Sequence, residues 1–485
     1  MPDAADLVAH ARETRVVVIG AAGAVAALEC AKVGMTVTIF DDAGLSGPPE
    51  TADLGGVAVD LDADGFAADV PAFAALVAEL GLDDRLEPLR PARTGIADLS
   101  APSPQRPPIP VPAEELLGIP ANVWDPAARR VIGWTGTWRA YLDRVRPPLT
   151  IGRERNLAAL VRSRMGDRVC ERLVAPVTRA RWGLDPSEVD VEAAARGLNG
   201  ALTRAGSLAG AVAEIVADGQ DDDVVFDDPG AWAAALTARL RDLGGHVRTG
   251  ARVRSIAREG GAWRIDVDET AAGVEVTATG DPGSAASSVV TADIVIVAAG
   301  EEGSRRLLAP VTALPEVGTT APEDVVLLRV RAGAASEGTF SELVSSTGAV
   351  RRVVDLTATR PSLARALGSD DRIVHVTAEA SDAADLVSVA VARAAASVVL
   401  GAPIADADVV AAQRVRRPGT VPAVRLGAAE EVGALRSAVA AIPGLGLTGA
   451  WISGGGRADV VADAVAEAVR LRRQVLWGDG AEGTS

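Results

Sequence analysis

The chain has almost no lysine. Among its 485 residues Lys32 stands alone, and every other basic side chain apart from the histidines is an arginine. Schiff-base catalysis and a P-loop nucleotide site both need a lysine, so these two kinds of chemistry are nearly excluded. Acidic residues outnumber basic ones, 65 against 48, and the formal net charge is -17. Nucleic-acid binding needs a basic face, so the charge argues against that class of protein.

Cysteine and histidine are scarce as well. Cys30 and Cys170 form no CxxC pair, which fits a reducing compartment and excludes a disulfide scaffold. His10, His246 and His375 lie far apart in the sequence and lack the spacing of metal ligands. We therefore predict no metal site.

The sequence also lacks a long apolar run near its start. Acidic residues occupy the place where a signal peptide has basic ones, and the uncharged stretch from Val16 to Leu28 is too short to span a bilayer. We expect a cytoplasmic protein without a transmembrane segment. Peripheral membrane contact, partner proteins and oligomeric state stay open.

What the chain does have is apolar material for a large core. Hydrophobic residues make up 48% of it, enough to exclude disorder over most of the length. The continuous β-branched run Val16–Ile19 is typical of a buried parallel strand, and an Ala-rich helix and a second strand, Thr36–Phe40, follow it. Asp293–Ala299 predicts another buried strand. The pattern predicts an α/β fold with an open parallel sheet.

The turn after the first strand partly matches a dinucleotide-binding turn. Such a turn uses glycines for a tight bend, for close approach of the pyrophosphate and for packing of helix on strand. Gly20 holds the first place, while Ala22 and Val25 hold the second and third. Asp41 follows Gly20 at the distance, about 20 residues, expected of the acid that binds a ribose hydroxyl. A βαβ unit that binds no dinucleotide remains an alternative.

Several later segments resemble one family. They are VDLDADGF (Val59–Phe66), ELLGIP (Glu115–Pro120), LAALVRSRMGDRVCERLVAP (Leu157–Pro176), VPAVRLG (Val421–Gly427) and IPGLGLTGAWISGGG (Ile442–Gly456). Together with the first βαβ unit they are similar to the flavin-dependent protoporphyrinogen/coproporphyrinogen oxidases of haem biosynthesis, in the amine-oxidase-like flavoprotein superfamily. The resemblance runs from about residue 14 to residue 475.

The resemblance implies a discontinuous FAD-binding, Rossmann-like domain made of residues 1–90, 225–310 and 420–485. Residues 91–224 would form a helical region at the substrate entrance, and residues 311–419 an inserted α+β substrate domain.

The family pattern also implies cofactor-binding positions. These are Gly20, Ala22, Asp41, Gly47, Gly230, Val253, Gly449, Gly454 and Gly456. Ala22, Val25, Leu45 and Pro48 replace residues of the family's flavin motifs, and these replacements predict weakened contacts with FAD.

Arginines are the candidates for substrate recognition, because a guanidinium matches a carboxylate with two hydrogen bonds. Arg93, Arg179 and Arg181 could bind substrate propionates, with Trp182 at the wall of the same cavity, and a structural ion pair is the alternative for each arginine. Trp134 and Trp138 are further candidates for the border of a tetrapyrrole cavity.

The resemblance implies an FAD-dependent oxidoreductase that oxidises coproporphyrinogen III or protoporphyrinogen IX with oxygen. No dedicated general base is evident in the sequence. One alternative is a non-catalytic, flavin-poor descendant that binds a tetrapyrrole or a partner protein. Another is a flavin oxidoreductase acting on an amine, although the sole lysine lies in the first βαβ helix.

Overall fold

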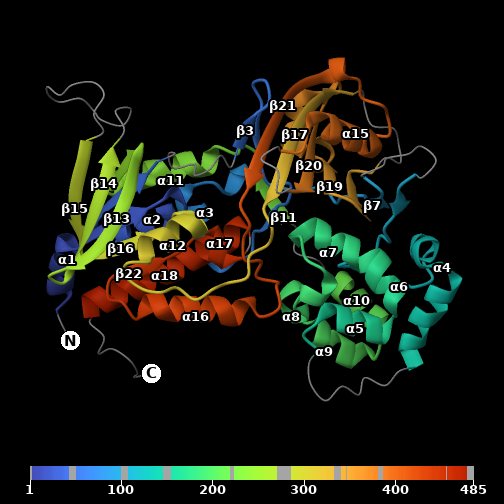
Figure 1. Cartoon of the computed structure of the whole chain (residues 1–485), viewed down its shortest axis with the longest axis horizontal. Coiled ribbons are helices and arrows are strands. Elements are labelled where there is room, and N and C mark those ends of the chain that lie inside the picture. The colour runs from blue at the N-terminus through green and yellow to red at the C-terminus, as the bar shows by residue number, and fades with distance from the viewer. Residues whose placement is uncertain are drawn as a thin grey trace.

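The computed structural model describes residues 3–42, 51–99, 107–145, 154–218, 223–269, 286–332, 340–345, 347–380, 386–454 and 456–477. Figure 1 shows three regions. A layered α/β region surrounds a parallel sheet on the left, a second sheet stands at the upper right, and a group of short helices lies below it.

A five-stranded parallel sheet forms the centre of the first region. In spatial order its strands are β12 (His246–Thr249), β2 (Thr36–Asp41), β1 (Arg15–Ile19), β16 (Ile294–Val297) and β22 (Leu445–Leu447). All four pairings are parallel. β1 after Arg15, and β16 throughout, are apolar and buried on both faces. A strand has this pattern when helices or another sheet cover both faces of its sheet. The strands come from distant parts of the chain, so the discontinuous Rossmann-like domain that we expected is confirmed.

Each face of this sheet has its own apolar layer. One face is covered by α2 (Ala24–Lys32), α3 (Pro71–Leu80), α11 (Ala231–Asp242) and α18 (Arg457–Trp477), with α1 (Ala4–Glu13) at the edge. The other face packs against the antiparallel sheet β13 (Ala251–Glu259), β14 (Ala262–Glu269) and β15 (Ala286–Ala292), and against α12 (Gly300–Leu308), α16 (Ala428–Ala440) and α17 (Ala450–Ser453).

The second sheet has seven strands. Their order is β21 (Val409–Arg417), β17 (Glu323–Arg331), β20 (Asp371–Glu379), β19 (Val350–Asp355), β18 (Glu342–Ser345), β7 (Thr94–Ala97) and β8 (Ile109–Pro110). α15 (Val389–Val399) covers one face. The hairpin of β3 (Thr51–Asp53) and β4 (Ala58–Asp60) covers the other, together with α13 (Leu356–Thr359) and α14 (Pro361–Leu367). Residues 91–224, which we expected to be a helical region, therefore also supply β7 and β8 to this sheet.

The helical region has its own core. It contains α4 (Pro126–Tyr141), α5 (Leu157–Arg164), α6 (Asp167–Val169), α7 (Ala175–Trp182), α8 (Val191–Ala194), α9 (Leu198–Ala205) and α10 (Leu208–Ala217). α4 contacts β8 of the second sheet, and α7 contacts the same sheet at a separate place, at β18 and β19. We call that place the junction.

Short strands complete the described part. β5 (Phe66–Ala67), β11 (Asp223–Phe226) and β6 (Leu86–Pro88) form a small sheet, and β9 (Glu115–Leu116) pairs with β10 (Ile119–Pro120). The α/β fold class is confirmed, while the domain boundaries at residues 90, 224, 310 and 419 stay predictions. Within the described ranges no helix is long and apolar enough to cross a membrane. The same residues contain no group of three or more His, Cys, Asp or Glu arranged to hold a metal ion.

Candidate functional site

The carboxyl ends of β1, β2, β16 and β22 meet at one edge of the parallel sheet, where folds of this kind bind nucleotides. Gly20 follows β1 with a φ of 100°, and its N–H donates to the carbonyl oxygen of Phe40 at 2.9 Å. A Cβ on Gly20 would lie 2.3 Å from the carbonyl oxygen of Ala298. Only glycine fits here, and Gly20 makes the tight bend after β1.

Gly23, directly before α2, lies tightly against β1. A Cβ on Gly23 would lie 2.4 Å from Cγ1 of Val18 and 3.1 Å from Cβ of Ala298. We expected this close approach at Val25, and the structure corrects that expectation, because Val25 is a buried core residue of α2. The turn thus passes from its first to its last glycine in three steps, whereas a Gly-x-Gly-x-x-Gly turn takes about five. It is a contracted turn.

Asp41 ends β2 beside the contracted turn, where a ribose-binding acid would lie. Its side chain is buried, and Oδ1 accepts a hydrogen bond from the N–H of Ala21 at 3.3 Å. A carboxylate of the chain therefore already contacts the first amide after Gly20.

Ala22, in the middle of the contracted turn, faces Gly449 from the C-terminal glycine motif. Gly449 has a φ of 129°, and a Cβ on it would lie 4.0 Å from Cβ of Ala22 and 3.6 Å from Cδ1 of Trp451. The Trp451 side chain is buried in the core beneath. The two turns that the family pattern assigns to cofactor binding thus lie close to each other.

The other two glycines of the C-terminal motif differ in the space around them: Gly454 is half-buried and Gly456 is exposed. Gly454 has a φ of 77°, and a Cβ there would lie 2.5 Å from the backbone nitrogen of Ala423. A Cβ on Gly456 would lie 3.8 Å from Cβ of Phe66, so this glycine leaves some space. The guanidinium of Arg457 lies over the ring of Phe66, with 5.5 Å between Cζ and the ring centre.

The other predicted cofactor positions give a mixed result. Gly230 precedes α11, and the nearest atom to an added Cβ would be Oδ1 of Asp228 at 3.4 Å, so nothing in the fold demands glycine there. Val253 is buried on β13. Gly47, Leu45 and Pro48 lie outside the described residues.

α7 carries three of the predicted substrate residues to the junction. Arg179 is exposed and its Nε donates to Oδ1 of Asp185 at 2.6 Å. Arg181 is exposed and lies close enough to Asp64 for its charge to lower the pKa of that carboxyl. Trp182 is half-buried against the core of the helical region.

Arg93 lies apart from these residues. Its side chain is exposed, its Cζ lies 5.3 Å from the centre of the Phe340 ring, and its backbone N–H donates to the hydroxyl of Ser341 at 2.8 Å. Trp134 and Trp138 are on the outer surface of α4, with exposed fractions of 62% and 54%. The structure therefore does not bring these three candidates into a shared cavity with α7.

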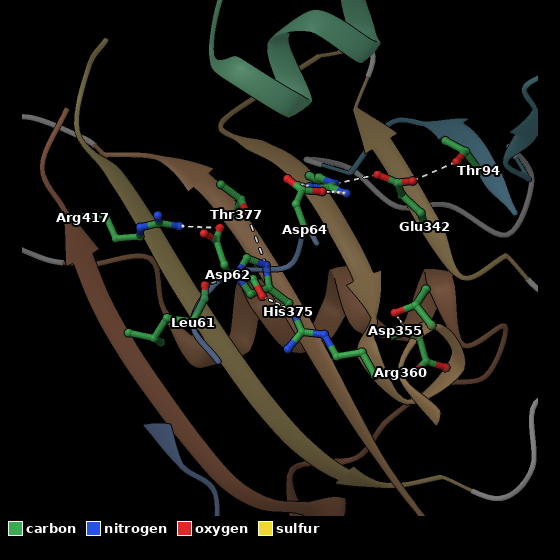
Figure 2. Close-up of polar contacts among 12 residues, drawn as sticks. Leu61, Asp62, Asp64, Thr94, Glu342, Asp355, Arg360, His375, Thr377 and Arg417 are labelled. Carbon is green, nitrogen blue, oxygen red and sulfur yellow. Dashed lines mark hydrogen bonds and ion pairs between the residues drawn. The ribbon is translucent and has the colours of Figure 1, made fainter. Parts of the chain in front are cut away.

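A row of polar contacts crosses the second sheet beside α7 (Figure 2). Arg352 on β19 binds both carboxylate oxygens of Asp64, at 2.9 Å from Nη1 and 2.8 Å from Nη2. Its Nε donates to Oε1 of Glu342 at 2.5 Å, and Oε2 of Glu342 accepts from the hydroxyl of Thr94 at 2.8 Å. These four residues, the junction cluster, connect β7, β18, β19 and the loop of residues 61–65.

Asp64 and Arg352 of the junction cluster stay ionised. Burial raises the pKa of Asp64, but the charge and hydrogen bonds of Arg352 outweigh burial and hold that pKa below its ordinary range. Burial lowers the pKa of Arg352, whereas Asp64 and Glu342 together raise it above its ordinary value. The side chain of Arg352 is 11% exposed and that of Asp64 39%, so the pair is protected on the arginine side and open to solvent on the other.

His375 on β20 holds the same loop at Leu61 (Figure 2). Its Nε2 lies 3.0 Å from the carbonyl oxygen of Leu61, and its Nδ1 lies 3.4 Å from the hydroxyl of Thr377. A carbonyl can only accept, so Nε2 carries the proton and Nδ1 accepts from Thr377. Burial lowers the pKa of His375 to about 4. On the loop itself, Asp62 binds Nη1 of Arg417 at 3.3 Å.

Glu115 on β9 is a further titratable group near the junction. One of its carboxylate oxygens accepts a hydrogen bond from the N–H of Gly118. Burial and the charge of Glu342 raise the pKa of Glu115, against the opposing influence of Gly118 and Arg181. A carboxyl that holds its proton to a higher pH than usual is a candidate acid or base.

A cavity of about 300 Å³ lies at the junction, between the end of α7 and the second sheet. Arg179 and Asp185 line it from the helical side, and Ser345, Arg351 and Glu379 line it from the sheet. Its two guanidinium groups and its hydroxyl are suited to bind a carboxylate. Asp185 and Glu379, the latter more than half exposed, are paired with these arginines, whereas a third acid of the lining, Glu188, accepts a hydrogen bond from the backbone N–H of Asp185.

Arg351 reaches this cavity because of a β-bulge. Consecutive side chains of a regular strand point to opposite faces, so Arg351 would be expected to point away from Arg352. The pairing of β19 with β20 shifts between Val350 and Arg352, which makes Arg351 the extra residue. Its guanidinium extends to Gly183 at the end of α7, where a Cβ would lie 2.6 Å from Nη1. It pairs with Glu379 at 3.5 Å.

Several of these residues were not predicted from the sequence. Asp64 and Glu115 lie inside segments that resembled the family, and a search for charges in those segments would have found both. Nothing in the sequence marks Arg351 or Arg352, because their roles depend on a bulge and on partners far away in the chain. His375 was noted only for its lack of metal-ligand spacing.

Three comparisons place this fold among known proteins. The family described as "Flavin containing amine oxidoreductase" matches residues 22–323, more than half of the chain. Coproporphyrinogen III oxidase of Mycobacterium tuberculosis is 31% identical over 242 residues, which cover 48% of this chain and 51% of the relative. The enzyme of that name from Propionibacterium freudenreichii is 27% identical over 175 residues, covering 36% of this chain and 32% of the relative.

Solved structures agree on the fold. A protein from Exiguobacterium, provisionally named protoporphyrinogen oxidase, aligns with a TM-score of 0.75 at 18% identity, covering 95% of this chain and 99% of that one. A UDP-galactopyranose mutase aligns with a TM-score of 0.62 at 12% identity, covering 96% and 94%. The sequence matches span at most about half the length of the curated relatives. By the extent of the family match, the chain belongs to the flavin containing amine oxidoreductase family.

Proposed function

We propose that the chain is an oxidoreductase of the porphyrinogen oxidase type. Its substrate would be an acidic tetrapyrrole, coproporphyrinogen III or protoporphyrinogen IX, and its oxidants a flavin, FAD by the family pattern, and oxygen. Family membership and the names of the curated relatives support the class of reaction. The observation that carries the substrate class is the junction cavity with Arg179 and Arg351 on opposite walls.

The chain's own residues would bind and orient the substrate. Arg351 and Arg179 would take a propionate between them, each exchanging part of its ion pair with a partly exposed acid for the substrate carboxylate. The junction cluster would hold the loop of residues 61–65 in place beside the cavity. Glu115 is the group near the junction whose raised pKa fits a proton transfer.

A bound flavin would supply the hydride acceptor that the oxidation needs. The sheet edge keeps two features of a nucleotide site, the tight bend at Gly20, where only glycine avoids a clash, and an acid at the end of β2, Asp41, although that carboxylate is buried against the turn. The contracted turn between them does not fit the diphosphate of FAD, so we assign no step of the reaction to that part of the site.

This misfit favours a second candidate function. A chain that cannot retain flavin would act as a tetrapyrrole-binding or partner protein instead of an oxidase. The contracted turn supports this alternative, whereas the intact cavity is compatible with both.

One experiment separates the two functions. The purified protein is mixed in air with coproporphyrinogen III, with and without added FAD, and porphyrin fluorescence and oxygen uptake are followed. The oxidase proposal expects porphyrin formation and oxygen uptake that depend on flavin. Binding of coproporphyrin without oxidation, even at saturating FAD, would support the second candidate. Neither binding nor oxidation would contradict both.

A further inference from the structure

The contracted turn has few backbone amides left for an anion. In a dinucleotide site the diphosphate accepts hydrogen bonds from N–H groups at the start of the first helix. Here the N–H of Ala21 donates to Oδ1 of Asp41 at 3.3 Å, that of Gly23 donates to the carbonyl oxygen of Gly20 at 3.1 Å, and that of Ala24 donates to the carbonyl oxygen of Ala21. Three of the four backbone N–H groups from Ala21 to Ala24, which would be donors to a diphosphate, are thus already bonded within the chain.

Charge acts in the same direction. Asp41 is buried and its carboxylate lies against the turn, so it occupies the position near the helix N-terminus that an anion would take. A diphosphate arriving there would have to displace one buried carboxylate oxygen and would then face its negative charge at short range.

Space is limited as well. The methyl group of Ala22 lies 4.0 Å from the place where a Cβ of Gly449 would be, and the indole of Trp451 lies behind Gly449. Gly23 cannot move toward β1 to make room, because it already lies against Val18. The turn can therefore open only if residues are added to it.

We infer that the contracted turn excludes the diphosphate of FAD, with Asp41 in the position of the anion. The inference rests on the proposed function for the presence of a flavin. It deepens that function by naming the part of the cofactor, the diphosphate, that the chain does not hold. The adenosine diphosphate half of FAD then adds little to affinity, and FAD and riboflavin bind about equally.

The test compares FAD with riboflavin by quenching of flavin fluorescence. In the natural chain we expect the two dissociation constants to agree within about tenfold. Insertion of Ala-Gly between Gly20 and Ala21 restores the full Gly-Ala-Gly-Ala-Ala-Gly spacing. In this variant FAD should bind at least about tenfold more tightly, while riboflavin affinity should not change.

A matched control places the same dipeptide between Gly260 and Gly261. Both glycines are in the hairpin turn of β13 and β14, with nothing within 4 Å of an added Cβ. This variant should bind both flavins as the natural chain does.

Asp41→Asn supplies a second test that needs no insertion. If Asp41 occupies the anion position, the neutral side chain should bind FAD as well as or better than the natural one. If Asp41 binds a ribose hydroxyl, the substitution should weaken FAD and leave riboflavin unchanged, which would overturn the inference. This test decides the question even if the insertion variant fails to fold.

The remaining outcomes are also decisive. FAD binding about 100-fold tighter than riboflavin in the natural chain would overturn the inference and leave the oxidase proposal intact. An insertion variant that folds but gains no FAD affinity would show that contraction is not the cause. If the natural chain binds neither flavin and the insertion variant binds FAD, the inference holds and the flavin-dependent function fails.

Discussion

Nε2 of His375 donates a hydrogen bond of 3.0 Å to the carbonyl oxygen of Leu61. The bond joins the second sheet to the loop that carries Asp64 into the junction cluster. Because burial lowers the pKa of His375 to about 4, the imidazole is neutral at physiological pH, as this bond and the one from Thr377 require. The loop is therefore held by the neutral imidazole of His375 at Leu61 and by the guanidinium of Arg352 at Asp64.

This arrangement predicts a loss of stability in mild acid. The unfolded chain binds a proton at His375 below the ordinary pKa of 6.5, whereas the folded chain does so only near about 4. Stability is thus full above pH 6.5 and falls as the pH drops toward 4, by at most about 3 kcal/mol from this group. Urea unfolding at several pH values should show this slope, and His375→Gln, whose amide can still donate to Leu61, should flatten it. Equal slopes in both proteins would refute the assignment.

Gly23 should be important for stability, although it does not match a glycine of the Gly-x-Gly-x-x-Gly spacing. In Gly23→Ala the added methyl would lie 2.4 Å from Cγ1 of Val18, so the helix must shift, at a cost of about 1–3 kcal/mol in unfolding free energy. Gly433→Ala is the matched control, because Gly433 lies in α16 with nothing within 4 Å of its added Cβ. This control should stabilise the protein by up to about 1 kcal/mol. Thermal unfolding should show a lower melting temperature for Gly23→Ala and an unchanged or higher one for Gly433→Ala. Similar changes in melting temperature in both variants would contradict the role of Gly23.

The same glycine shows where the sequence was and was not sufficient. The apolar runs of β1 and β16 predicted the parallel sheet, because a strand that is buried on both faces has apolar residues at consecutive positions. The end of the turn could not be predicted by counting a fixed glycine spacing, because a shortened turn moves the close contact from Val25 to Gly23. Only the contacts of the folded chain show which residue touches Val18.

The junction was harder to predict for a different reason. Arg179 and Arg181 were identified as candidates, since arginine in a family-like loop is a local signal. Arg351 and Arg352 had no such signal, because their direction is set by a bulge that depends on pairing with β20. Arg93, identified by the same reasoning as Arg179, instead lies on the ring of Phe340.

The ion pair of Arg352 should be a major source of stability for the junction. Arg352→Ala leaves Asp64 and Glu342 without their shared partner, and loss of one member of a buried pair costs about 3–5 kcal/mol. Because Asp64 is 39% exposed, we expect the lower end of that range. The control is Arg254→Ala, which breaks the pair with Asp268 on the surface hairpin, where the arginine is 64% exposed, and this substitution should cost much less than Arg352→Ala because solvent screens the pair. Denaturant unfolding measures both, and equal losses would contradict the role of Arg352.

Binding of an acidic porphyrin should depend on Arg351 and not on Arg93. Arg351 reaches the junction cavity through the bulge and has a long ion pair of 3.5 Å with an exposed Glu379, so its guanidinium can turn to a substrate carboxylate. Arg351→Ala should weaken coproporphyrin binding by about 1.5–3 kcal/mol, the range for a lost hydrogen bond to a charged group. Arg93→Ala, which removes an equal charge outside the cavity, serves as the control and should bind as the natural chain does. Fluorescence titration of coproporphyrin and of its tetramethyl ester tests the cause, because the ester lacks the carboxylates and should bind equally to all three proteins. A loss at Arg93 with none at Arg351 would move the substrate site away from the junction.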